Sequence, residues 1–199
     1  IAGYYSDFGT PDKPNEKTWN DSDNLYQTRP DSITLRITCL QDPGFFQDVV
    51  VKPDENGRWL WHTQLEKYNS QTGELYEYRV EEVKVAGYTS VVSGAVVDET
   101  LGACYVDIKN TLETVDIPVE KQWADGGDES NRPESITVYL MADGQKYTDI
   151  NGKEVSLTLS AADEWKGTFA GMPKYAPDGN EMQYDISETI VPCYLPAQI

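Results

Sequence analysis

The chain has 199 residues, of which 39% are hydrophobic and 11% aromatic, enough apolar material to bury a core. Its 34 acidic and 16 basic residues give a formal net charge of −18. This charge disfavours nucleic acid and anionic membranes as partners, since both are bound through clustered Lys and Arg. No apolar run is long enough to span a bilayer. One histidine and three cysteines leave little for a metal site, and we expect neither a metal nor a cofactor.

The sequence repeats itself at an offset of about 105 residues. Lys-x-Trp-x-Asp begins at Lys17 and again at Lys121, and Arg-Pro-x-Ser-Ile-Thr begins at Arg29 and again at Arg132. Two tandem domains are therefore predicted. We place the first at residues 15–112 and the second at 113–199. Residues 1–14 are interpreted as a leader or as the tail of a preceding repeat, because Ala2-Gly3-Tyr4-Tyr5 resembles Val85-Ala86-Gly87-Tyr88.

Within each repeat the local pattern is that of β-structure. Ile33, Leu35, Ile37 and Cys39 alternate with polar residues, which is the period of a strand with one buried face. Turn sequences such as Asp54-Glu55-Asn56-Gly57 recur at short intervals. No helical stripe of ordinary length is present. We expect an all-β protein made of two β-sandwiches, with Cys39 and Cys104 as buried core thiols.

Some expected strands carry one polar residue in an otherwise apolar, inward-facing row. These residues are Glu82, Asn110, Lys121 and Glu188. A buried charge must pair or become neutral, so burial favours a neutral lysine amine and a protonated acid. A neutral amine can attack an asparagine carboxamide that an acid polarises, which gives an isopeptide bond and free ammonia. This would be a single self-modification, not enzymatic turnover. A buried salt bridge, or strands that end early, would explain the same rows.

The order of these motifs resembles that of the collagen-adhesin B-type (Cna B-type) domain. The resemblance rests on Lys-x-Trp-x-Asp, Arg-Pro-x-Ser-Ile-Thr, a tryptophan, Tyr-x-(Val/Ile)-x-Glu, Val-(Pro/Ala)-x-Tyr and a strand ending in asparagine. It implies an immunoglobulin-like inverse sandwich with an autocatalytic Lys–Asn isopeptide bond. In the first domain it implies Lys17 as nucleophile, Asn110 as acceptor and Glu82 as the proton-relaying acid. In the second, Lys121 and Glu188 take the matching roles.

Such domains form the stalks of adhesins and pilins on Gram-positive bacteria. The resemblance thus implies an extracellular, cell-wall-attached location, with a host surface ligand or neighbouring repeats as partners. Two departures stand out. The residues before Lys17 lack apolar alternation, and the second domain has no asparagine-terminated strand after Tyr194. Truncation, or a strand donated by a partner, would explain the missing acceptor.

Two other functions are considered. A module that binds glycan or a host protein would use exposed aromatic residues, and Trp61, which shares a strand face with Trp59, is the candidate for stacking on a sugar. The oxygen-rich loop with Asp21, Asp23 and Asn24 invites comparison with a calcium site, but it lacks EF-hand spacing. Ordinary polar turns are the favoured interpretation of this loop.

Overall fold

The computed structural model describes residues 7–199, and these form two compact units. The first contains residues 29–112 together with the chain up to residue 23, and the second contains residues 24–28 and 113–199. Strands dominate both units, and the helical segments in the described residues are two short 3₁₀ turns, at Glu129–Asn131 and Ala161–Asp163. The prediction of an all-β protein is confirmed. No helix in this range is long and apolar enough to cross a membrane.

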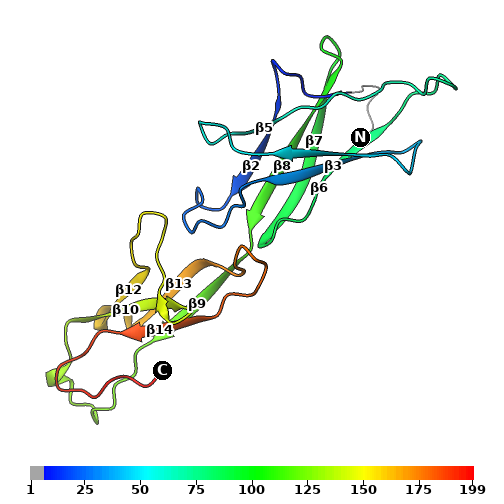
Figure 1. Ribbon diagram of the computed structural model, residues 1–199. Helices are drawn as coiled ribbons and strands as arrows, with labels where there is room; N and C mark the ends of the chain where they lie inside the picture. The colour runs from blue at the N-terminus through cyan, green and yellow to red at the C-terminus, as the bar shows by residue number, and fades with distance from the viewer. Residues whose placement is uncertain (1–6) are drawn as a thin grey trace. The chain divides into compact units, whose positions relative to one another are not determined.

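The first unit is a sandwich of two sheets (Figure 1). Its strands are β1 (Asp7–Phe8), β2 (Asn15–Asn20), β3 (Ile33–Cys39), β4 (Phe46–Val51), β5 (Trp59–Trp61), β6 (Tyr78–Glu82), β7 (Tyr88–Asp98) and β8 (Ala103–Leu112). One sheet has β8 at its centre, with β7 on one side and β2 and β1 on the other, and β5 lies beyond β2. The other sheet has the order β4-β3-β6. Strands β6 and β7 are thus edge strands of opposite sheets.

The core of the first unit lies between these sheets. Alternate residues of β3 face it, with Leu35 and Ile37 fully buried, and Ile108 of β8 does the same from the other sheet. Cys39 and Cys104 are buried free thiols, as predicted. The structure corrects the idea that Trp61 stacks on a sugar. Trp61 is only 3% exposed and packs against Phe8 in the core, so its face is not available to a ligand.

Part of the stretch interpreted as a leader contributes to this unit. Strand β1 pairs in parallel with β8, and Phe8 is buried in the core. The resemblance of residues 2–5 to the end of a repeat lies wholly outside the described residues.

The second unit repeats the first only in part. Its strands are β9 (Thr114–Glu120), β10 (Ser135–Ala142), β11 (Gln145–Lys146), β12 (Ser156–Ser160), β13 (Lys166–Pro173) and β14 (Tyr184–Glu188). Strand β10 lies between β12 and β14, with β11 paired at its end, and β9 pairs with β13. Up to residue 199, nothing in this unit corresponds to β7 and β8, so one edge of β9 is unpaired.

Candidate functional site

The two sheets of the first unit bring Lys17, Glu82 and Asn110 together. Strands β2 and β8 are parallel neighbours, with Lys17 opposite Ile108 and Trp19 opposite Asn110, so the lysine and the asparagine lie one step apart on adjacent strands. Glu82 ends β6 in the facing sheet and pairs with the fully buried Leu35. Since directly paired residues share a face of the sheet, Glu82 points into the core toward the other two residues.

The Glu82 carboxyl lies between the amine and the carboxamide. Asn110 Nδ2 donates a hydrogen bond of 2.6 Å to Glu82 Oε1. Glu82 Oε2 lies 4.0 Å from Lys17 Nζ, which donates to the backbone carbonyl of Thr18 at 2.9 Å. Within residues 7–199, Glu82 Oε2 and Asn110 Oδ1 are buried without a hydrogen-bond partner. The acid is therefore placed to exchange protons with both groups.

Burial moves these groups toward their neutral forms. The side chains of Lys17 and Glu82 are both 0% exposed, and Asn110 is equally buried. Desolvation lowers the pKa of Lys17 to about 7, although the Glu82 charge opposes the shift. Desolvation also raises the pKa of Glu82, against the hydrogen bond from Asn110 and the charge of Lys17. Both shifts favour the neutral amine and the protonated acid over the charged pair.

A polar cluster beside the lysine was not predicted. Asp21, with a fully buried side chain, accepts two hydrogen bonds of 2.7 Å from Arg29 and one of 2.9 Å from the Tyr88 hydroxyl. Trp19 packs edge-on against Tyr88, and Lys17 Nζ lies 3.1 Å from the centre of a Trp19 ring. The cluster thus fixes the ring that covers the amine. Its sequence signal was the recurrence of these residue types in both repeats.

Comparison with known proteins identifies the family. The Cna protein B-type domain family matches residues 14–111 and 117–198, most of the chain. The chain belongs to this family. A collagen adhesin of Staphylococcus aureus is 32% identical over 180 residues, a match that covers 89% of the chain and 14% of that protein. The chain therefore corresponds to a small part of its relative.

Solved structures of B-type repeats are also similar. The two-repeat B1B2 fragment of the S. aureus collagen-binding protein is 24% identical, with a TM-score of 0.43 over 94% of this chain and 44% of the other. The pilus adhesin SpaC of Lactobacillus rhamnosus GG, in its open conformation, is 15% identical, with a TM-score of 0.32 over 90% of this chain and 20% of the other. The family match and the sheets described above confirm the predicted immunoglobulin-like B-type sandwich.

The second B-type unit duplicates the polar cluster. Asp125 accepts hydrogen bonds of 2.7 and 2.9 Å from Arg132 and one of 3.1 Å from the Tyr194 hydroxyl. The ring centre of Trp123 lies 4.9 Å from those of both Trp165 and Tyr194. The Arg132 guanidinium is the main cause that holds the pKa of Asp125 well below its usual range. An arginine thus binds the aspartate in both units, including the Asp21 loop that was compared with a calcium site. In residues 7–199 no group of three or more His, Cys, Asp or Glu residues could hold a metal ion.

In the second unit, Lys121 and Glu188 form an ion pair, but residues 113–199 supply no asparagine on a strand beside them. Lys121 Nζ lies 2.9 Å from Glu188, and their side chains are 14% and 10% exposed, whereas Lys17 and Glu82 are fully buried. The pair lines a groove of about 250 Å³ between the sheets, together with Val119, Ile186 and the segment 197–199. In the first unit, β8, which carries Asn110, pairs with β2, the strand that holds the matching Lys17.

Proposed function

We propose that this chain is a structural stalk segment of a Gram-positive surface adhesin or pilin, locked by an autocatalytic isopeptide bond between Lys17 and Asn110. The observation that carries the proposal is the buried Glu82 carboxyl, 2.6 Å from the Asn110 amide and 4.0 Å from the Lys17 amine. Family membership supports an extracellular, cell-wall-attached location. Neighbouring repeats and a host surface ligand are the proposed partners of the parent protein.

The chemistry uses only these three side chains. Neutral Lys17 Nζ attacks Asn110 Cγ, while protonated Glu82 polarises the carboxamide after a half-turn that brings its oxygen to the acid. The C–Nδ2 bond then breaks. The lysine nitrogen gives up one proton, the leaving nitrogen gains one, and Glu82 passes the proton between them. Amine and carboxamide become a secondary amide and ammonia, with Glu82 unchanged, so the reaction occurs once per chain.

The burial of the site favours this reaction over a simple ion pair. A charged pair without further hydrogen bonds is costly in a dry core, and Glu82 Oε2 has no such bond within the described residues. Fixed neighbours on two sheets also supply a high effective concentration, on the order of 10⁵ M or more in favourable cases. Burial thus shifts the pair toward its neutral, reactive form.

The intact mass of the purified chain tests this proposal. We expect a deficit of about 17 Da relative to the calculated mass, one ammonia for the bond in the first unit. Lys17→Ala and Glu82→Ala should each restore the full mass of the respective variant. Proteolytic mapping should recover the peptides around residues 17 and 110 joined together.

Two neighbouring variants are matched controls. Lys109 and Glu81 are exposed residues adjacent to Asn110 and Glu82. Chains with Lys109→Ala or Glu81→Gln should keep the deficit of about 17 Da. A wild-type chain with its full calculated mass would overturn the proposal.

We further propose that the second unit reacts with an extended strand that carries an asparagine, whether it follows in the same polypeptide or comes from another one. The unpaired edge of β9, within residues 113–199, is the counterpart of the β2 edge that receives β8. Edge strands accept added strands through backbone hydrogen bonds. The groove beside it already holds Lys121 and Glu188.

A synthetic peptide with the sequence of residues 103–112 tests this second proposal. We expect a covalent adduct whose mass is the sum of chain and peptide less about 17 Da. The adduct should disappear with Lys121→Ala and persist with Lys17→Ala. A peptide in which alanine replaces the asparagine is the matched control. Failure of the wild-type peptide to form any adduct would argue against a strand-accepting second unit.

A further inference from the structure

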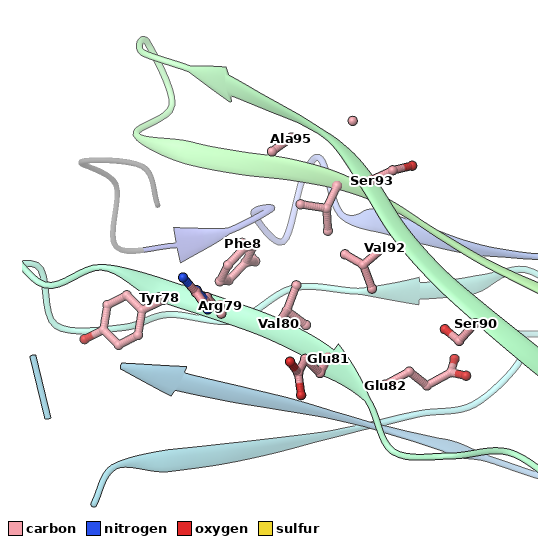
Figure 2. Close-up of a pocket in the computed structure, with 12 residues that line it drawn as sticks. Phe8, Tyr78, Arg79, Val80, Glu81, Glu82, Ser90, Val92, Ser93 and Ala95 are labelled. Carbon is pink, nitrogen blue, oxygen red and sulfur yellow. The ribbon is translucent and has the colours of Figure 1, made fainter. Parts of the chain in front are cut away.

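A cavity of about 630 Å³ opens between the edge strands β6 and β7 (Figure 2). Its floor is mainly apolar and includes Phe8, Val80 and Val106, while Glu82 and Ser90 line it near one end. The Glu82 side chain itself is 0% exposed, whereas Ser90 is an exposed residue. Ser90 therefore lies at the boundary between the cavity and the buried carboxyl.

The sheet register directs the Ser90 side chain toward the reaction site. Ser90 on β7 is directly opposite Asn110 on β8, so the two side chains share the inward face of their sheet. Glu82 points inward from the facing sheet, and Figure 2 shows the Ser90 hydroxyl beside the Glu82 carboxyl. Ser90 hydrogen bonding opposes the rise in the pKa of Glu82 that desolvation causes. One serine thus adjoins both the acid and the acceptor.

We propose that Ser90 is a positioning residue for the isopeptide reaction: its hydroxyl orients the Glu82 carboxyl so that one oxygen faces Asn110 and the other faces Lys17. This inference rests on the proposed function. Asn110 engages Oε1, and Oε2 makes no hydrogen bond within residues 7–199, so the Ser90 hydroxyl beside the carboxyl is a second group that can keep it from rotating away from the amine. The cavity that Ser90 borders also gives the departing ammonia a route to solvent.

Among residues 7–199, few charged groups affect the pKa of Glu82. Lys17 is the nearest from β2, and Arg29 and Asp21 act on Lys17. Strand β3 contributes the apolar Leu35, and β7 and β8 contribute the neutral Ser90 and Asn110. Loss of the hydroxyl therefore removes one group that stabilises the carboxylate, and the pKa of Glu82 should rise further.

The rate of bond formation after refolding measures this effect. The full chain is assembled in guanidinium by ligation at Cys39 and Cys104, so that no bond forms before dilution, and the loss of ammonia is followed by mass at a series of pH values. We expect Ser90→Ala to lower the maximal rate about fivefold to tenfold, the effect of one hydrogen bond. The alkaline limb of the pH profile should move to higher pH because the acid form persists longer. Ser90→Thr should restore both, and Ser93→Ala, on the same strand, is the control.

A merely structural serine would change the folding yield but not the alkaline limb. If wild type and Ser90→Ala had the same maximal rate and the same alkaline limb of the pH profile, the inference would be overturned. A second measurement is independent of the crosslink. In a Lys17→Met chain, which cannot react, the Glu82 carboxyl is titrated by carbon-13 NMR. Ser90→Ala should raise its pKa, and an unchanged value would also overturn the inference. If the wild type forms no bond but Ser90→Ala still raises the pKa of Glu82, the proposed function fails while the contact between Ser90 and Glu82 is supported.

Discussion

A chain with Glu82→Gln is expected to lose about 4 to 5 kcal/mol of stability in its first unit. The substitution keeps the size of the side chain but removes the acid, so Lys17 and Asn110 stay unjoined. In the loop-entropy treatment, a crosslink that closes a loop of about 100 residues stabilises by this amount through its effect on the unfolded chain. For a domain of this size the loss corresponds to a fall in melting temperature of roughly 20 °C or more. Calorimetry of the full chain measures it.

The matched comparison is Glu81→Gln, which alters an exposed residue next to Glu82. That variant should melt like the wild type. Lys17→Met, which also prevents the bond but places no amine in the core, should lose comparable stability. If Glu82→Gln lacked the bond but had the same melting temperature as the wild type, the crosslink would have no stabilising role.

Replacement of Arg29 by alanine is the second large expected effect. It would leave Asp21, whose side chain is 0% exposed, without its bidentate partner. Breaking a buried ion pair from one side typically costs about 3 to 5 kcal/mol, because the remaining buried charge loses that counter-ion. Denaturant unfolding of Arg29→Ala in the Glu82→Gln background isolates this cost from the crosslink.

Two further variants separate the charge effect from general damage. Arg29→Lys keeps the charge but not the planar two-point contact, so its loss should be intermediate. Adding Asp21→Asn to Arg29→Ala removes the buried charge and should recover part of the stability. A double variant no more stable than Arg29→Ala alone would show that the cost is not electrostatic.

The sequence pattern predicted one side of the site better than the other. The apolar alternation of β8 placed Asn110 in a buried row, and the fully buried residue in the structure confirms it. The stretch before Lys17 had no such alternation, yet Lys17 is 1% exposed. The reason is Asn15, whose buried amide donates to the Cys104 carbonyl at 3.3 Å and accepts from the Val106 amide at 2.9 Å. A polar residue can line a core when another strand satisfies it, which periodicity does not detect.

Other parts of the site depend on contacts between distant segments. The pairing of Asp21 with Arg29 and Tyr88 joins a loop to the start of β7, and only its recurrence in the second repeat gave a signal. Ser90 gave none, because its role depends on the gap between the edges of two different sheets. The burial of Trp61 reflects its place on β5, next to β2, where a short strand with two tryptophans closes the core.

The parallel pairing of β2 with β8 has a consequence for how far the molecule can be stretched. Residues 18–109 lie between the two reacting side chains, and roughly 300 Å of fully extended polypeptide is stored in them. Once Lys17 and Asn110 are joined, a pull on the flanking chain bypasses this reserve, and the unit contributes almost no extra length under force. A cell held by many such segments in series would keep a nearly constant distance from its surface of attachment.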